Sequence, residues 1–341
     1  MGEQSSRAFV ASFGGPEKVS IVTAEIAAPA KQEVQVKVNY SAMGGADIAM
    51  REGLYPMQKS APLTLGYCLL GRVHKNGPGS SKFKKGDLVA SLTKYDSQAE
   101  LANVPEKYLI PVPENIDQEK AIALVVEWTT AYGMTLRSDK IKKGDRVFIH
   151  GLSGAVGHAL VELCLKQGAD VYGTAAAVSH DELRAEGVTP FVYTNKDWIA
   201  SMKALGGVQH VMDALGFESW DESWSILASD GGHLIGYGGN GTILEGKEPR
   251  SQIPTVTKLL ARGMNPFCPK STTFFYIDKD QSTFAPELQK LFQMLLNGEI
   301  QVRIKKTYTL DQVPEAHANW TKVKGIGSVI VKVADDVKGS L

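Results

Sequence analysis

Cysteine is scarce in this sequence, and the few that occur are isolated. Cys68, Cys164 and Cys268 lie far apart along the 341 residues. At such spacings they form neither a disulfide framework nor a CxxC metal motif. This pattern favours a reducing compartment, and we expect a cytoplasmic protein.

Excess charge and long apolar runs are also missing. Lysine plus arginine and aspartate plus glutamate each number 37, so the formal net charge is zero. Without Lys/Arg-rich runs, electrostatic binding to nucleic acid or anionic lipid is not expected. No apolar run approaches the ~20 residues that a membrane-spanning helix needs, and the first residues lack the apolar core of a secretion signal. We therefore expect no nucleic-acid partner and no membrane insertion.

What is present fits a globular protein with a substantial core. Hydrophobic residues make up 43% and charged residues 22% of the chain, both ordinary for such proteins. At about 150 residues per domain, the length predicts two domains.

The spacing of apolar residues changes near residue 146. Before it, short apolar runs separated by Gly, Pro and Asn predict a β-rich region, with strands at 8–11, 19–23, 33–40, 71–74, 88–91 and 107–111. After it, strands at 147–149, 170–174, 191–193, 210–213 and 233–237 alternate with helices at 181–186, 198–205 and 219–227, and a long helix follows at 286–297. This alternation predicts parallel βαβ units in a doubly wound sheet. A last β-like segment, 328–333, is expected to return to the β-rich region.

The stretch 146–175 has the pattern of a dinucleotide-binding turn. An apolar strand is followed by Gly151, Gly154 and Gly157, and then by a helical pattern with apolar residues on one face. Glycine allows positive φ in a tight strand-to-helix turn and lets the backbone approach a pyrophosphate closely. The helix start then offers unpaired N–H groups to the anion. Because the spacing is GxxGxxG rather than GxGxxG, a glycine-rich turn without a ligand is the alternative.

Further blocks accompany this turn. Residues 47–56 read DIAMREGLYP, residues 86–89 read GDLV and residues 130–132 read TAY, while Leu-Gly and Tyr-Gly pairs follow the fourth and fifth predicted strands of the doubly wound sheet. With these blocks the chain resembles the medium-chain dehydrogenase/reductase superfamily, in its zinc-free quinone oxidoreductase group. Residues 173–193 are most similar to the vesicle-amine-transport-protein branch.

The resemblance implies an α/β fold with two domains. A GroES-like β domain is expected at 1–118 with 302–341. A Rossmann domain, with a doubly wound parallel sheet, is expected at 119–301. The active site of such proteins is a cleft between the two, at the carboxyl ends of the sheet strands.

The resemblance also implies which residues form the site. Tyr55 is the first catalytic candidate, because a phenol can donate a hydrogen bond to a developing enolate oxygen while staying neutral, and Tyr67 is the second; packing alone is the alternative for both. Asp47 matches a family carboxylate with a structural role. The expected cofactor-binding residues are Thr130, Ser153, Gly154, Ala155, Val156, Thr174, Ser179, His180, Tyr193, Leu215, Tyr237, Gly238 and Phe275. The expected substrate cleft is lined by Gly44, Tyr55, Tyr67, Phe274 and Tyr276.

Zinc ligands are missing where zinc-containing relatives carry them. Those relatives have a Cys-His pair at the positions of Gly44 and Gly45, and a His-Glu pair at the positions of Tyr67 and Cys68. Since a catalytic zinc needs three protein ligands, we expect no zinc and no other metal. Hydride addition to an activated C=C bond is a reaction that needs no metal, because the negative charge then develops on a remote oxygen that hydroxyl or backbone donors can stabilise.

The cofactor preference follows from the end of the second strand of the doubly wound sheet. An acidic residue there normally binds the adenosine ribose and repels a 2′-phosphate, but residues 174–180 read TAAAVSH. The missing carboxylate predicts NADPH rather than NADH. Ser179 and His180 either hydrogen-bond that phosphate or are, respectively, a helix cap and a solvated residue. Tyr193 either packs near the adenine or is a buried strand residue.

The sequence and the resemblance thus predict a zinc-independent, NADPH-dependent reductase of quinones, enones or other α,β-unsaturated carbonyl compounds. The substrate is expected to be a small molecule. A pocket widened by the missing side chains would suit a bulky substrate, as in a reductase of specialised metabolism. The family's edge-to-edge pairing of Rossmann sheets implies a homodimer. Gly44 and Gly325 replace family asparagines, and Ser179 and Ser328 replace basic residues. These departures keep two alternatives open: a non-redox cyclase or isomerase with a repurposed cleft, and a non-catalytic binding or structural protein. Three histidines are interpreted as strand-end, helix-face and surface residues: His150, His158 and His317.

Overall fold

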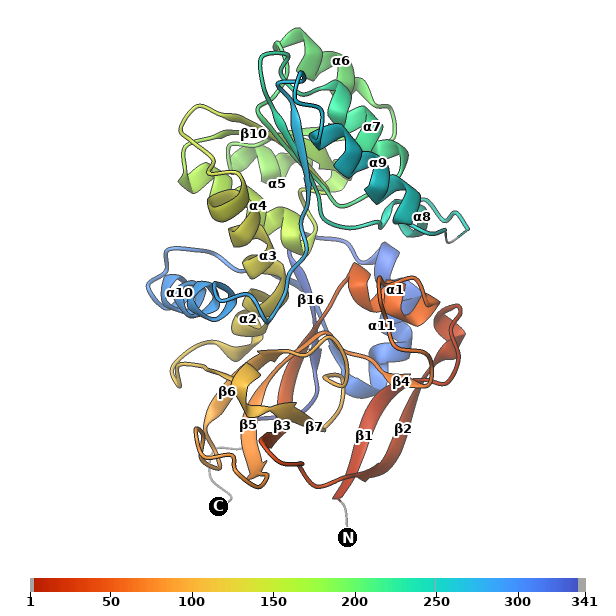
Figure 1. Ribbon diagram of the computed structural model, residues 1–341, viewed down its shortest axis with the longest axis vertical. Coiled ribbons are helices and arrows are strands. Elements are labelled where there is room, and N and C mark those ends of the chain that lie inside the picture. The colour runs from red at the N-terminus through yellow and green to blue at the C-terminus, as the bar shows by residue number, and fades with distance from the viewer. Residues whose placement is uncertain (1–2, 249, 337–341) are drawn as a thin grey trace. The chain divides into compact units, whose positions relative to one another are not determined.

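The structure is a computed structural model that describes residues 3–248 and 250–336. It divides into two compact units, which can be followed by residue number in Figure 1. The first unit comprises Met1–Thr129, Asp278–Lys324 and Ser328–Leu341, and the second comprises Thr130–Ile277 and Gly325–Gly327. The domain boundaries expected from the sequence stay a prediction, and residues 1–2 and 337–341 of the expected first domain lie outside the described residues.

The first unit is built on two β-sheets. The smaller has the order β2-β1-β4, and the larger has the order β15-β16-β3-β5-β6-β8, with β7 paired to β3 beside this path. The strands of the smaller sheet are β1 (Glu3–Val10), β2 (Val19–Ile26) and β4 (Leu63–Thr64). Those of the larger are β3 (Glu33–Met43), β5 (Cys68–Asn76), β6 (Leu88–Leu92), β7 (Leu101–Pro105), β8 (Ile110–Pro111), β15 (Ile304–Thr309) and β16 (Ser328–Lys332).

The last strand returns to this unit, as the sequence predicted. β16 pairs antiparallel with β3, and Val329 lies opposite Met43. Apolar and polar residues alternate along β3, and successive side chains of a strand point to opposite faces. Val34, Val36 and Val38 therefore lie on one face, where they are fully buried in the core. Thus the C-terminal segment completes a sheet that begins in the first forty residues.

The prediction of a strand at 107–111 is confirmed only for its last two residues. Residues Glu106–Tyr108 close a 3₁₀ turn, in which the N–H of Leu109 donates to the carbonyl of Glu106 at 3.2 Å. Only Ile110–Pro111 pairs as β8. Strand β7 just before it was missed, because its run LANVP is short and has a single β-branched residue.

Helix α1 (Gly45–Glu52) explains the DIAMREGLYP block. At its start, the N–H of Gly44 donates to Asp47 Oδ2 at 2.9 Å, and at its end Gly53 has φ +79°. A Cβ at Gly53 would lie 2.8 Å from the ring of Phe13, so only glycine fits there. Arg51 Nε donates to the carbonyl of Gly14 at 3.1 Å. The block therefore fixes α1 against the segment that holds Phe13, and Asp47 has the structural role that the resemblance implied.

The second unit contains a parallel sheet with the strand order β11-β10-β9-β12-β13-β14. Its strands are β9 (Arg146–His150), β10 (Asp170–Ala175), β11 (Thr189–Val192), β12 (His210–Asp213), β13 (His233–Gly236) and β14 (Ser271–Phe274), and all pairings between them are parallel. This order is that of a Rossmann sheet, with the topological switch point between β9 and β12. The doubly wound parallel sheet is therefore confirmed.

Helices cover both faces of this sheet. In Figure 1, α4 (Ala155–Lys166) and α5 (His180–Ala185) lie on one side, and α6 (Asp197–Ala204), α7 (Glu218–Ser225) and α9 (Ile253–Gly263) lie on the other. Phe148 of β9 packs on Trp198 of α6 with ring centroids 4.9 Å apart, inside a core that also buries Trp220. Within the described residues, no helix combines the length and the apolar character needed to cross a bilayer.

A cluster of two histidines and an aspartate lies at the amino ends of strands β12 and β13. Asp139 accepts hydrogen bonds from His210 Nδ1, at 2.6 Å, and from His233 Nδ1. His210 Nε2 contacts Asp145 Oδ2 at 3.0 Å, and His233 Nε2 contacts Thr273 Oγ1 at 2.9 Å. Both ring nitrogens of His210 face carboxylates, an arrangement that favours the doubly protonated, positively charged ring. The segment that holds Asp139 and Asp145 is thereby tied to the sheet.

The pKa values of this cluster are shifted in opposite directions. Burial by itself lowers the pKa of His210, but the hydrogen bonds and charges of Asp139 and Asp145 outweigh it and hold the pKa above its ordinary value. Burial likewise raises the pKa of Asp139, but the hydrogen bonds from His210 and His233 outweigh it and the pKa is lowered. The contribution of His210 to the free energy of unfolding is fully present below about pH 6.5, and it is lost as pH rises through the pKa of the folded state. Stability from Asp139 is present above about pH 4 and is lost as pH falls through its folded pKa.

We predict that Asp139→Asn lowers the free energy of unfolding by roughly 2–3 kcal/mol at pH 5.5, since it removes charged hydrogen-bond acceptors from two histidines. The loss should be smaller at pH 9, because the stability that His210 contributes is lost as pH rises through its raised pKa. Urea denaturation at the two pH values measures both numbers. Asp181→Asn is the matched control, because the Asp181–Arg184 pair is exposed and such pairs contribute little. An equal loss at the two pH values would contradict the assigned charge of His210.

Candidate functional site

The turn between β9 and α4 has a backbone that only glycine permits at two positions. Gly151 has φ +78°, in the left-handed region. A Cβ at Gly157 would lie 2.0 Å from the carbonyl oxygen of Gly151, which no real side chain can do. The missing side chain therefore lets the first turn of α4 cross directly over the end of β9.

This crossing leaves backbone amides at the start of α4. The first hydrogen bond inside the helix runs from the N–H of His158 to the carbonyl of Gly154 at 2.8 Å. The amides of Ala155, Val156 and Gly157 precede it and have no acceptor within the helix. With the positive end of the helix dipole, they form a site suited to a phosphate group.

One expected contact of the loop is already used inside the chain. The N–H of Gly154 donates to the carbonyl of Gly151 at 2.9 Å, and so closes the turn rather than facing a ligand. The carbonyl of Ser153 accepts from the N–H of Gly327 at 3.1 Å. Of the residues expected to hold a diphosphate, Ala155 and Val156 thus have the most suitable amides.

A buried hydrogen-bond network lies behind the loop. Asp213, at the carboxyl end of β12, is fully buried and accepts from the hydroxyls of Ser219 and Ser223 at 2.7 Å each. Ser223 Oγ lies 3.0 Å from His150 Nε2, and His150 Nδ1 lies 3.5 Å from Thr174 Oγ1. Thr174 Oγ1 in turn accepts from the N–H of Gly151 at 3.1 Å. The network therefore connects the switch point of the sheet to the first residue of the loop.

Donors and acceptors in this network are consistent with a neutral histidine. Because Ser223 gives its proton to Asp213, His150 donates from Nε2 and accepts at Nδ1. Burial lowers the pKa of His150, and the charge of Asp213 opposes this only in part. His150 was expected to be a strand-end residue without an identified partner; the position is right, but the structure gives it these partners.

The other expected cofactor residues of the second unit gather at the carboxyl ends of successive strands. Thr174 precedes the end of β10, Leu215 follows β12, Tyr237 and Gly238 follow β13, and Phe275 follows β14. Since all these strands are parallel, their carboxyl ends form one edge of the sheet. The N–H of Leu215 donates to Asp213 Oδ1 at 2.7 Å, which ties this edge to the network. Thr130, the first residue of the second unit, lies in the short helix α3 (Thr129–Tyr132) and is 7% exposed.

Phe275 is packed rather than open. Its side chain is 8% exposed, and a Cβ on Gly133 would lie 2.6 Å from its ring. The Arg137 guanidinium lies 5.6 Å from the ring centroid. Its neighbours Phe274 and Tyr276 are half-buried. The three aromatic residues therefore line the end of β14, with Phe275 on its inner side.

The region after β10 differs from the second alternative given for Ser179 and His180, a helix cap and a solvated residue; the phosphate contact stays a prediction. His180 is 7% exposed and contacts the carbonyl of Ala175 through Nε2 at 3.2 Å, so it is not solvated. Ser179 is 4% exposed and forms no side-chain cap on α5. Tyr193 follows β11 and is 59% exposed, so it is not a buried strand residue.

In the first unit, the structure brings the two catalytic candidates together. The hydroxyls of Tyr55 and Tyr67 are 2.5 Å apart, and their rings meet edge to face with centroids 5.7 Å apart. Tyr67 is 3% exposed, whereas Tyr55 is half-buried. Gly44 caps α1, and a Cβ built there meets nothing within 4 Å. The surroundings of Gly44 therefore leave room for a β-carbon at the position where the family carries asparagine.

The metal-ligand positions of zinc-containing relatives hold no metal-binding set. Cys68 is fully buried, and burial raises the pKa of its thiol. Among residues 3–248 and 250–336, no three His, Cys, Asp or Glu side chains form a group that could hold a metal ion.

Sequence reasoning misplaced one histidine and missed a carboxyl group. His317 was expected at the surface but is 3% exposed, and burial, followed by the charge of Arg51, lowers its pKa to about 3. His158 is buried on α4. Glu127 had not been singled out, although an acidic residue within the apolar run AIALVVEW is an unusual pattern.

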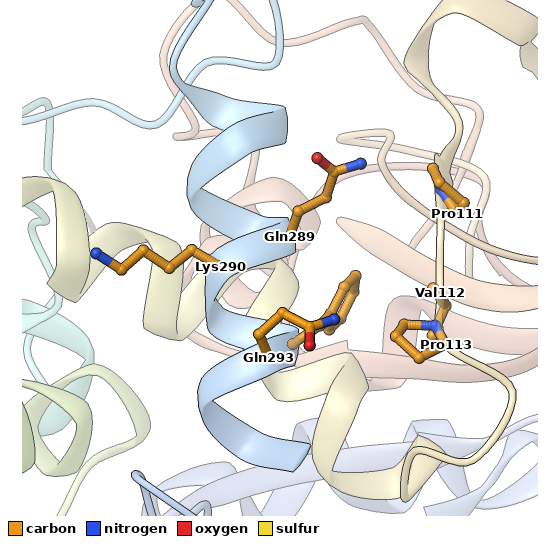
Figure 2. A pocket seen from close by; sticks show the side chains of 7 residues that line it. Pro111, Val112, Pro113, Gln289, Lys290 and Gln293 are labelled. Carbon is orange, nitrogen blue, oxygen red and sulfur yellow. The ribbon is translucent and has the colours of Figure 1, made fainter. Parts of the chain in front are cut away.

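A separate pocket of about 510 Å³ lies in the first unit. Figure 2 shows it between the segment Pro111-Val112-Pro113 and α10 (Phe284–Leu296), from which Gln289, Lys290 and Gln293 project. It contains none of the residues that the sequence indicated for chemistry.

Two family models match this chain. The alcohol dehydrogenase GroES-like domain matches residues 30–114, and the zinc-binding dehydrogenase matches residues 186–331. The synaptic vesicle membrane protein VAT-1 homolog of Homo sapiens is 28% identical over 334 residues, which cover 94% of this chain and 84% of that protein. The quinone oxidoreductase of Homo sapiens is 27% identical over 328 residues, covering 93% and 94%. The crystal structure of Escherichia coli quinone oxidoreductase complexed with NADPH has a TM-score of 0.81 at 23% identity, covering 96% of this chain and all of that one.

A GroES-like β unit followed by a Rossmann unit defines a class of two-part dehydrogenases and reductases. Within it, the chain belongs to the medium-chain dehydrogenase/reductase superfamily, in its quinone oxidoreductase-like group. The resemblance and the fold class predicted from the sequence are confirmed. In general class, the protein is an oxidoreductase of this superfamily.

Proposed function

We propose that the protein is a zinc-independent, NADPH-dependent reductase of quinones, enones or other α,β-unsaturated carbonyl compounds. The observation that carries the proposal is the start of α4. There, the amides of Ala155 and Val156 lie at the carboxyl edge of a Rossmann sheet with no acceptor within the helix. The quinone oxidoreductases among the relatives support the reaction class.

The residues present fit a dinucleotide. The close approach at Gly157 gives the helix start the geometry that a diphosphate needs, and the network from Asp213 to Thr174 holds the loop in that shape. The amides at the helix start would hold the diphosphate, and the edge formed by Leu215 and Tyr237 would hold the rest of the dinucleotide.

NADPH is preferred in this proposal because the end of β10 lacks an acidic side chain. Ala175 is followed by Ala176, Ala177 and Val178, so nothing there repels a 2′-phosphate. Asp181, the first carboxylate along the chain, is fully exposed on α5 and ion-pairs with Arg184 at 3.0 Å.

The two tyrosines are proposed to handle the oxygen on which charge develops. When bound, a nicotinamide cofactor would supply the hydride for the electrophilic carbon of the substrate. Tyr55 donates its hydroxyl proton toward the enolate or phenolate oxygen, and Tyr67, 2.5 Å away, donates to the Tyr55 oxygen as that proton moves. Zinc is not needed in this proposal, because Gly44, Gly45 and Tyr67 replace the ligands of zinc-containing relatives.

Binding and turnover together test the proposed function. We predict that NADPH raises the melting temperature of the purified protein more than NADH does, because a ligand that binds only the folded state stabilises it by about 2.7 kcal/mol at 100 times its Kd. We also predict that NADPH absorbance decays when a simple quinone or enone is added. Thermal shift and absorbance at 340 nm measure the two effects.

Each alternative gives a different result in the same assay. Stabilisation by NADPH without hydride transfer to any quinone or enone would favour a repurposed, non-redox site. No response to either nucleotide would favour a non-catalytic protein, and would overturn the proposal.

A second prediction concerns the tyrosine pair. Tyr55→Phe should lower kcat for an enone by roughly 10²-fold, the usual cost of removing one oxyanion donor. Tyr67→Phe should lower it by about tenfold, since it removes one supporting hydrogen bond. Neither should change the Kd for NADPH. Tyr108→Phe is the matched control, because that hydroxyl donates to Asp280 at 2.7 Å in an exposed position. Wild-type kcat in Tyr55→Phe would show that the ring only packs.

A further inference from the structure

Glu127 is a buried acid that the proposed chemistry does not use. It lies in the π-helical turn η3 (Leu124–Trp128) and is 4% exposed. Its Oε2 accepts a hydrogen bond from the hydroxyl of Ser328, the first residue of β16. Within the part of the chain that the structure describes, its Oε1 has no hydrogen-bond partner.

The groups that face Glu127 come from several elements of the first unit. Burial raises its pKa to about 8; the Ser328 hydrogen bond and the charge of Lys305 on β15 oppose this rise, and Asp47 of α1 adds to it. Burial in turn lowers the pKa of Lys305. Cys68 of β5 is nearby, and burial keeps its thiol protonated, with the charges of Asp47 and Glu127 adding to that effect. Near neutral pH, Glu127 is therefore mostly uncharged.

Ser328 directly follows a segment that packs with the second unit. Residues Gly325–Gly327 group with that unit, and the N–H of Gly327 donates to the carbonyl of Ser153 in the β9–α4 loop at 3.1 Å. Gly325 and Gly327 have φ of +102° and +115°, which other residues rarely adopt. Gly327 is hydrogen-bonded to the β9–α4 loop, and the next residue, Ser328, is hydrogen-bonded to Glu127.

We propose that Glu127 is a positioning residue for dinucleotide binding: through Ser328 it fixes the segment 325–327 that supports the β9–α4 loop, and a negative charge on Glu127 weakens NADPH binding. The proposal rests on the proposed function. A charged carboxylate at this position would have one oxygen without a partner in a buried site, which is costly. The ionised carboxylate is attracted to the charge of Lys305 on β15 and binds the Ser328 hydroxyl more strongly than the neutral acid does. A shift of the carboxylate toward Lys305 would therefore carry Ser328 and the residues just before it out of position.

The test compares the Kd for NADPH at pH 7 and pH 9.5 in the wild type, Glu127→Gln and Ser328→Ala. Above pH 7 the 2′-phosphate does not change charge, since a phosphate monoester loses its second proton at about pH 6. The wild-type Kd should rise at least about fivefold over this range, a usual size for coupling between sites. Glu127→Gln keeps an acceptor for Ser328 but cannot ionise, so its Kd should stay constant. Ser328→Ala should raise the Kd already at pH 7.

Glu119→Gln is the matched control. Glu119 also accepts a hydrogen bond from a hydroxyl of the first unit, that of Thr307 on β15, but it is half-buried, and Thr307 is not adjacent in sequence to residues 325–327 as Ser328 is. This variant should show the same rise in Kd as the wild type. A wild-type rise that persists unchanged in Glu127→Gln would overturn the proposal.

Hydrogen exchange separates this proposal from the proposed function. In the protein without nucleotide, Ser328→Ala should speed amide exchange in residues 151–158 and 325–328, whereas Glu119→Gln should not. If NADPH binds no form of the protein but this difference is found, the reductase assignment fails while the positioning role of Glu127 is kept. If exchange in both segments equals that of the wild type, the positioning role fails whether or not NADPH binds.

Discussion

The close approach of helix α4 to the end of strand β9 is the constraint on which the candidate site depends. The backbone of Gly157 passes so near the carbonyl of Gly151 that a Cβ would lie 2.0 Å from it. This approach brings the start of α4 over the carboxyl end of the sheet, where helix amides without an acceptor face outward. A parallel sheet with the strand order of a Rossmann unit then provides the rest of the edge.

Buried polar groups hold this geometry from two directions. Within the second unit, the network from Asp213 through Ser223 and His150 reaches the first residue of the loop. At the other end of the same sheet, Asp139 fixes the amino ends of β12 and β13 through two histidines. Unpaired polar groups in these places would be costly, and so both clusters restrict the sheet to one arrangement. The first unit contributes a hydroxyl pair, Tyr55 and Tyr67, suited to proton donation.

Much of this fold could be predicted from the sequence because its main signals are local. Strand β12 was predicted with its observed bounds, since a short apolar run stands between clear turns, and the glycine pattern located the loop. Helix α9 was missed although its apolar residues follow a helical period, and two of its apolar side chains, Ile253 and Leu260, are exposed. Strand β7 was missed because a run of this length and composition fits a loop equally well.

The partners of buried polar residues could not be predicted, because they come from distant parts of the chain. His317 lies on a short helix, and nothing near it in sequence shows that it is buried. Glu127 and Ser328 are hydrogen-bonded across 201 positions. The tyrosine pair was proposed residue by residue from the family resemblance, but only the fold shows that the two hydroxyls meet.

The most direct test of the account is the Kd for NADPH of Ala155→Pro, with the wild type measured alongside. Proline fits the first position of a helix, and Gly154 already has the extended backbone that a following proline requires. The substitution therefore removes one amide hydrogen from the start of α4 and leaves the fold intact. We predict an unchanged melting temperature without nucleotide and a Kd raised roughly tenfold or more, the value of one hydrogen bond to a charged group. An unchanged Kd would contradict the claim that these amides hold the diphosphate.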